Sequence, residues 1–222
     1  MLGRLSPGQQ AGGVFALLLA LLVLTVRAVP ATPYYERFLP WIVARGVGLT
    51  ALVLLTVLVS LGILLSHPLN RSVWRQTKEL LVWHRYLWTF VIALIAVHVV
   101  AILLDRYAHV SLFGALVPGL SGYRALPVAL GTISLYALLL TAASAAYAKL
   151  LPAGLWLGIH RWGALVFALS WAHALLTGTD SLALRPFYLF LLAVVAVSAA
   201  VRYWMAVPRP QAPQARKGDS PS

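Results

Sequence analysis

The sequence contains no cysteine and only 5 acidic residues among 222. Without cysteine there can be no disulfide, no thiolate-held iron–sulfur cluster, no thiol catalysis and no covalently attached c-type haem, because each of these needs sulfur. Charged residues make up 10% of the chain, against about 25% in an ordinary soluble domain, and 61% of the residues are hydrophobic. A soluble globular enzyme is therefore nearly excluded.

The few charges are mostly positive, and 17 lysines and arginines give a net charge of +12. They are scattered singly between apolar runs, with no basic tract and no nucleic-acid motif. Such charges are typical of the loops of a membrane protein that face anionic lipid. We therefore expect a lipid bilayer as a partner and no nucleic acid.

The apolar residues fall into six runs, each long enough to cross roughly 30 Å of hydrocarbon as a helix. The runs cover residues 12–28, 41–66, 84–105, 126–150, 155–176 and 184–207. Helices are the only open segments that satisfy their own backbone groups inside a bilayer. We therefore predict an all-α membrane protein, a bundle of six transmembrane helices.

The first run also resembles a secretory signal, because Arg4 precedes it and small residues follow near Ala28 and Ala31. Arg27 and the nearby prolines make a poor cleavage site, so we expect the first helix to be retained. Cleavage would leave five helices and would not move the others.

The basic residues predict the orientation of the bundle. With both termini on one side, that side holds eleven lysines and arginines and the other holds six. We therefore expect both termini to be cytoplasmic. The predicted organisation is a first transmembrane helix and outer loop (1–40), a core of helices two to five (41–177), a sixth transmembrane helix (178–207) and a disordered cytoplasmic tail (208–222).

The longest outer loop, residues 106–125, has an apolar middle at residues 110–117. This segment is too short to span a bilayer. We expect it to lie at the membrane interface or to cap the bundle from outside.

Four of the six histidines form two pairs within the predicted helices. His84 and His98 stand at positions i and i+14 of the third run, and His160 and His173 stand at i and i+13 of the fifth. Each separation covers roughly 20 Å along a helix, the distance between two sites stacked across a bilayer. Under the predicted orientation, His84 and His160 lie near the cytoplasmic side. Neutral imidazoles on facing helices can hold one b-type haem by both axial positions, so two pairs would hold two haems.

The helical period fits the two pairs unequally. A step from i to i+14 returns a side chain to within about 40° of the same face, whereas a step to i+13 leaves it about 140° away. We therefore expect a distortion in the fifth helix, which Gly163 would permit.

Two alternatives remain for these histidines. They could be buried side chains satisfied by backbone or hydroxyl groups, or they could form a proton relay. A relay favours acidic partners within the spans, whereas the nearest acids lie at helix ends or in loops: Glu36, Glu79, Asp105 and Asp180. For His67, at a helix end, and His109, in the outer loop, we expect ordinary interfacial or solvated positions.

Three features stand together in residues 41–177: Arg45-Gly46-Val47-Gly48, His84-Arg85 followed by His98, and His160-Arg161-Trp162-Gly163 followed by His173. In these the chain resembles the ferric reductase-like transmembrane superfamily. That superfamily includes the membrane domain of NADPH oxidases, iron reductases and the haem subunit of the bacterial periplasmic methionine sulfoxide reductase system. The resemblance implies an inner haem b on His84 and His160. It implies an outer haem b on His98 and His173.

Haem propionates are anionic and favour cationic partners near each membrane face. Arg45 lies near the outer end of the second run and is the candidate for the outer haem. Arg85 and Arg161, which each follow a histidine, are candidates for the inner haem, as are Arg71 and Arg75. Ordinary positive-inside topology is the alternative explanation for the inner arginines.

The expected function is that of a transmembrane b-type cytochrome, the haem component of an oxidoreductase in a bacterial inner (plasma) membrane. It would relay electrons through two bis-histidine haems to an outer acceptor, which is ferric iron, oxygen or a partner protein. No GxGxxG follows a predicted strand, so FAD or FMN is expected only on a separate partner. The donor is then a cytoplasmic flavoprotein or membrane quinol. The alternatives are a single-haem subunit serving a periplasmic reductase, and a non-haem transport or proton-conducting protein.

Overall fold

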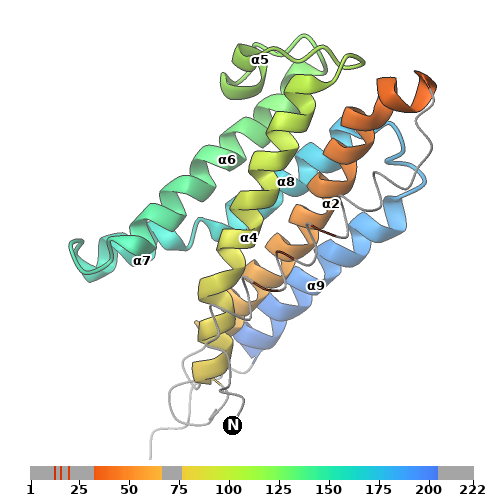
Figure 1. Cartoon of the computed structure of the whole chain (residues 1–222). Helices are drawn as coiled ribbons and strands as arrows, with labels where there is room; N and C mark the ends of the chain where they lie inside the picture. Colours follow the sequence, from red (N-terminus) through yellow and green to blue (C-terminus); the bar gives the residue numbers. More distant parts are fainter. Residues whose placement is uncertain (1–12, 14–15, 17–19, 21–32, 67–76, 205–222) are drawn as a thin grey trace, which may run out of the picture.

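The computed structural model describes residues 13, 16, 20, 33–66 and 77–204. Within this part of the chain the structure is helical and contains no strand (Figure 1). The all-α prediction is therefore confirmed for these residues. The predictions for the tail, for His67, Arg71 and Arg75, and for nearly all of the first run lie outside the described residues.

Four of the described helices are long and apolar enough to cross a membrane, and each matches a predicted run. They are α2 (Pro33–Leu65), α4 (Thr77–Leu104), α6 (Ala125–Ala146) and α9 (Arg185–Trp204). Both α2 and α4 begin about two turns before the apolar runs that predicted them. Polar residues can continue a helix beyond the hydrocarbon, so the apolar run marks the span and not the whole helix. The helices indicate a membrane protein.

The predicted fifth helix consists of two shorter helices. α7 (Ala153–His160) and α8 (Gly163–Thr177) are separated by Arg161 and Trp162. At the break the Trp162 N–H donates to the carbonyl of Ile159, three residues back, at 2.9 Å, as in a turn. The expected distortion is confirmed, and it lies directly before the glycine that was expected to permit it.

α2 is the central helix of the bundle. It packs against α4, α8 and α9, while α6 packs against α7 and α8. The buried share of the apolar segment is largest in α2, at 44%, and smallest in α4, at 11%. The core is made of apolar side chains from five helices: Leu52, Leu55, Leu58, Val59, Val91, Leu138, Val166, Phe167, Tyr188 and Leu191.

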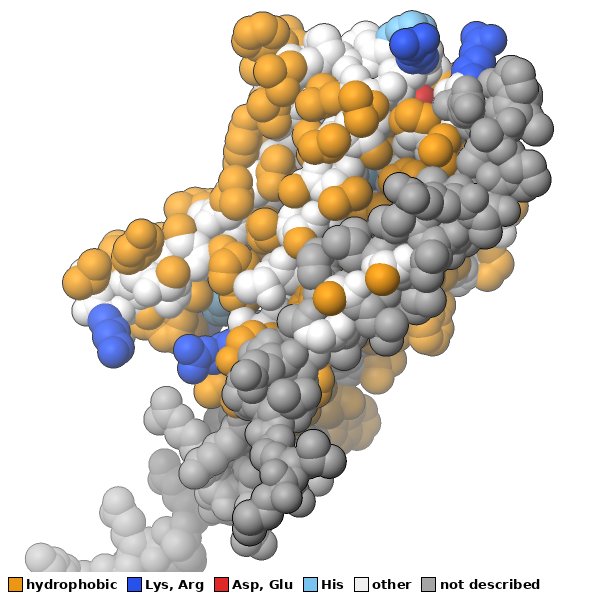
Figure 2. All heavy atoms as spheres, viewed as in Figure 1, with side chains coloured by type: hydrophobic (Ala, Val, Ile, Leu, Met, Phe, Trp, Pro, Cys, Tyr) orange, Lys and Arg blue, Asp and Glu red, His pale blue; other side chains and the backbone are white. Residues whose placement is uncertain are grey.

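Hydrophobic side chains cover much of the outer surface of the bundle, and the lysines and arginines in view lie toward its two ends (Figure 2). Large exposed side chains such as Val100, Leu139 and Phe190 belong to three different helices. A soluble monomer rarely exposes such a continuous apolar surface, whereas a bilayer covers it. The apolar surface and the lengths of the helices therefore both indicate a membrane protein.

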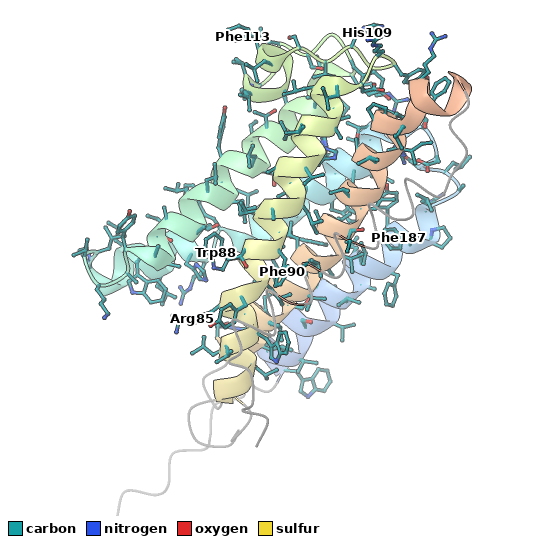
Figure 3. The ribbon with its side chains drawn as sticks, in the orientation of Figure 1. Arg85, Trp88, Phe90, His109, Phe113 and Phe187 are labelled. Atoms are coloured by element: carbon teal, nitrogen blue, oxygen red, sulfur yellow. The ribbon has the colours of Figure 1, made fainter. Side chains whose placement is uncertain are left out.

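A short helix, α5 (Leu112–Leu116), lies within the long loop and packs on the start of α6. The Thr132 hydroxyl donates to the Ala115 carbonyl at 2.8 Å, and the Tyr136 hydroxyl donates to the Leu116 carbonyl. Figure 3 shows Phe113 at this end of the bundle, where its side chain is 70% exposed. We call this end of the molecule the α5 end.

Successive long helices alternate in direction, so the described basic residues gather at two ends (Figure 1). The α5 end holds Arg37, Arg45, Arg106, Arg124 and Arg185, and the opposite end holds Arg85, Lys149, Arg161 and Arg202. These sets agree with the division made from the charge count. Which end faces the cytoplasm stays a prediction.

Because the sequence has no cysteine, a single introduced thiol can be labelled without background. His109 at the α5 end and Lys149 at the opposite end are both exposed. We expect a membrane-impermeant maleimide to label His109→Cys from outside intact cells, and Lys149→Cys only after the membrane is opened. Labelling of both from one side would contradict the alternating arrangement, whereas exchanged sides would overturn only the predicted orientation.

Candidate functional site

Two pairs of histidines lie close together inside the bundle. His84 on α4 and His160 at the end of α7 have ring centroids 6.0 Å apart and ring planes at 77°. His98 on α4 and His173 on α8 have centroids 6.3 Å apart and planes at 90°. The second pair lies toward the α5 end and the first toward the opposite end. The structure thus places next to each other the same partners that the helix directions predicted.

Each of the four rings hydrogen-bonds through Nδ1 to a main-chain carbonyl of a neighbouring helix. The bonds are His98 to Ala44 at 2.7 Å and His84 to Leu58 at 3.1 Å, both on α2, and His173 to Pro127 at 2.8 Å and His160 to Thr141 at 3.4 Å, both on α6. A carbonyl oxygen can only accept, so Nδ1 must carry the proton in each case. Nε2 therefore keeps its lone pair, which is the tautomer of a histidine that binds a metal through Nε2.

Three glycines make room for these rings. A Cβ at Gly48 would lie 2.9 Å from Nδ1 of His98, and a Cβ at Gly131 would lie 2.6 Å from Nδ1 of His173. A Cβ at Gly62 would lie 3.1 Å from the ring of the other α4 histidine. Any side chain at the first two positions would push the imidazole off its carbonyl, so glycine is required there by close approach.

The separation within each pair fits two imidazoles that bind one metal ion from opposite sides. With about 2.0 Å for each metal–nitrogen bond and about 1.1 Å from nitrogen to ring centre, the centroids would lie about 6.2 Å apart. The observed separations are 6.0 and 6.3 Å.

Each pair offers two protein ligands. Among the described residues, no three His, Cys, Asp or Glu side chains form a group able to hold a metal ion. Further ligands would therefore have to come from a bound group, and a haem, whose macrocycle already binds its iron, fits this donor set.

A cavity opens beside the pair at the α5 end. It is lined mainly by apolar side chains of α2, α4, α6 and α8, together with His98 and His173. Arg45 also lines it, forms an ion pair with Asp180 and lies over the ring of Trp41, 5.8 Å from the ring centroid. The cavity thus joins two imidazoles and one guanidinium in apolar surroundings, which suits a largely apolar ligand with an anionic edge.

Two further predicted cations fall within the described residues, and both lie at the opposite end. Arg85 and Arg161 directly follow the paired histidines and are exposed, and Figure 3 shows Arg85 with Trp88 near the lower part of α4. His109 is exposed in the loop at the α5 end and lies outside both pairs. Of these predicted arginines, Arg45 lines the cavity beside His98 and His173. Arg85 and Arg161 directly follow the histidines of the other pair in the sequence.

Sequence reasoning did not identify the partners of the histidines. The four acceptors are backbone carbonyls, which leave no mark on the sequence. One signal was present: Gly48 and Gly62 stand at i and i+14 on one helix, the same separation as His84 and His98 on the next. Matching separations on adjacent antiparallel helices indicate residues that meet at two levels.

No family model, curated protein or solved structure matches this chain. The assignment of the site therefore rests on the geometry of its own residues.

A pair of glycine substitutions tests this packing. Gly48→Ala forces the ring of His98 off its carbonyl and should lower the free energy of unfolding by about 1–3 kcal/mol, the cost of an unsatisfied buried donor. Gly46→Ala is the matched control on the same helix, because a Cβ there has nothing within 4 Å. It should be neutral or stabilising by up to about 1 kcal/mol. Unfolding of the detergent-solubilised protein measures both, and equal effects would contradict the packing.

Proposed function

We propose that this chain is a membrane b-type cytochrome of the ferric reductase-like kind, with one haem held by His84 and His160 and a second by His98 and His173. One observation carries the proposal. In each pair, both Nδ1 atoms are held by helix carbonyls, and the separation of the rings fits two imidazoles that would hold one metal ion. Histidines that only needed a hydrogen bond would have no reason to meet in pairs at this distance.

Haem, when bound, would supply a one-electron iron couple, and the two histidines of each pair would be its protein ligands. The protein's own residues then bind and orient the group, because the carbonyl bonds fix both the tautomer and the plane of each imidazole. This arrangement favours electron relay over direct binding of a substrate at iron.

The spacing of the pairs supports transfer across the membrane. The separation of i to i+14 on α4, which is one helix through both of its histidines, places the two levels roughly 20 Å apart. Between them in sequence lie Val91, which is fully buried, and Phe167, which is 3% exposed. Both belong to the main apolar core, which excludes water from the region between the two levels.

The acidic residues give little support to a proton relay. Among the described side chains, Asp105 and Asp180 lie at the α5 end and none lies between the two histidine levels. Asp180 pairs with Arg45, and Asp105 accepts the N–H groups of Tyr107 and Ala108 at 3.1 and 2.6 Å. Asp180 thus has a local partner, whereas Asp105 has partners at Oδ2 alone and its buried Oδ1 accepts no hydrogen bond.

The electron must enter from one side and leave on the other. We propose a cytoplasmic flavoprotein carrying FAD or FMN, or membrane quinol, as the donor. Ferric iron, oxygen or a partner protein is the proposed outer acceptor. Each electron accepted from the donor is passed on, so the chain itself needs no net proton or atom transfer. The proposed location is a bacterial inner membrane.

Haem content is the direct test. The purified protein should show a Soret band and, after dithionite, a reduced α-band, with two haems per chain. His98→Ala or His173→Ala should each remove about one haem, because a single imidazole holds the group weakly, and should leave the other centre in place. The control is His109→Ala, which changes an exposed histidine outside both pairs and should keep both haems.

Several results would count against the proposal. A wild-type protein without a Soret band would exclude a cytochrome. Full haem content in all four histidine variants would exclude the ligand assignment. One haem per wild-type chain would support the single-haem alternative.

Arg45 gives a second test, because it lines the cavity of the outer pair. Arg45→Gln should make the outer haem easier to lose in detergent, by about fivefold to thirtyfold for the loss of one charge-assisted contact of about 1–2 kcal/mol. Arg37→Gln is the matched control, since Arg37 is an exposed cation on the same helix and its guanidinium lies over Phe38. Equal haem loss from the two variants would remove Arg45 from the site.

A further inference from the structure

The four carbonyls that accept the histidine bonds occur at matching positions in two helices. The two acceptors on α2 stand at i and i+14, and so do the two acceptors on α6. Four residues beyond each acceptor stands a small residue: Gly48, Gly62, Gly131 and Ala145. Only the carbonyl used by His160 is followed at this position by a residue with a side chain.

This position controls access to the carbonyl. In an α-helix the carbonyl of residue i already accepts the N–H of residue i+4, and the Cβ of residue i+4 tilts back toward it. At Gly48, Gly62 and Gly131 the imidazole approaches the oxygen on the side of residue i+4, where a Cβ would meet the ring. The contacts agree, since a Cβ at Gly131 would lie 2.6 Å from Nδ1 of His173, which bonds the carbonyl of Pro127.

The hydrogen bond beside Ala145 is also the longest of the four. The bond of His160 to Thr141, beside Ala145, is 3.4 Å long, beyond the usual range of about 2.7–3.2 Å. The three bonds beside glycine are 2.7, 2.8 and 3.1 Å long. Both bonds of the His84 and His160 pair are longer than both bonds of the pair at the α5 end, but only that of His160 stands beside a residue with a side chain.

We propose that Ala145 is a positioning residue that makes the two histidine pairs unequal as ligands. The proposal rests on the proposed haem binding. A strong Nδ1 hydrogen bond raises the basicity of an imidazole and so favours the oxidised metal. The weak bond of His160 therefore leaves the centre on His84 and His160 easier to reduce than it would be with glycine at position 145. Under the predicted orientation this is the centre nearer the cytoplasm, where the electron enters.

The test is a redox titration of the haem-loaded protein followed at the α-band. Ala145→Gly should let His160 approach its carbonyl and shift the midpoint potential of the inner centre to a lower value, with no shift of the outer centre. His98→Ala, which lacks the outer haem, identifies the inner component of the titration. Ala143→Gly is the matched control, because it places the same helix-weakening change two residues away on a different face of α6 and should leave both potentials unchanged.

The reciprocal variant is Gly131→Ala, which adds to the outer pair the side chain that the inner pair has. It should raise the midpoint potential of the outer centre or release the outer haem, while the inner centre is retained. If this variant does not fold, the comparison of Ala145→Gly with Ala143→Gly still tests whether Ala145 sets the potential of the inner centre.

The outcomes separate this inference from the proposed function. No haem in the wild-type protein would overturn both. Two haems in the wild type, with inner potentials that are the same in Ala145→Gly and Ala143→Gly, would overturn only the role of Ala145. An unchanged outer centre in a folded Gly131→Ala variant would do the same.

Discussion

The structure depends on one constraint, the need of each half-buried imidazole N–H for a hydrogen-bond acceptor inside an apolar bundle. Inside an apolar bundle the acceptors at hand are helix carbonyls, and each of these already accepts a bond within its own helix. An imidazole reaches one at Gly48 and Gly131, where a Cβ on the residue one turn later would collide with the ring. The histidines therefore fix how closely α4 approaches α2 and α8 approaches α6, and at which level along their axes.

The same construction is used twice. α2 with α4, and α6 with α7 and α8, are helical hairpins in which the first helix supplies carbonyls at i and i+14 and the second supplies histidines. In the second hairpin the histidines stand only at i and i+13, which an unbroken helix would place on different faces. Because the helix is broken at Arg161 and Trp162, His160 and His173 can each reach a carbonyl of α6, although they are 13 residues apart and the carbonyls are 14 residues apart. The break is therefore part of the site.

Much of the fold and of the histidine site could be predicted from the sequence, because the length of an apolar run and the helical spacing of residues depend on the order of the side chains. Four spans, the pairing of the histidines and the distortion before Gly163 follow from those two quantities. The carbonyl partners could not be predicted, since a backbone group looks the same at every position. Gly48 and Gly62, which are 14 residues apart on α2, were an indication of two of these partners. On α6 the corresponding positions are Gly131 and Ala145, so a repeat of glycine is not visible there. The packing of α5 on α6 was also hidden, because it depends on hydroxyl-to-carbonyl bonds between segments distant in sequence.

The cavity at the α5 end shows how few acidic residues the chain has. Arg45 and Asp180 form the one ion pair found among the described residues, and the arginine side chain is 19% exposed while the aspartate is 47% exposed. A guanidinium in an apolar cavity needs a counter-ion, because an unpaired buried charge is costly. Asp180, in the loop between α8 and α9, supplies this counter-ion from a half-exposed position. The cation therefore lines the cavity while the anion of the pair stays largely in contact with water, which lowers the cost of holding the guanidinium there.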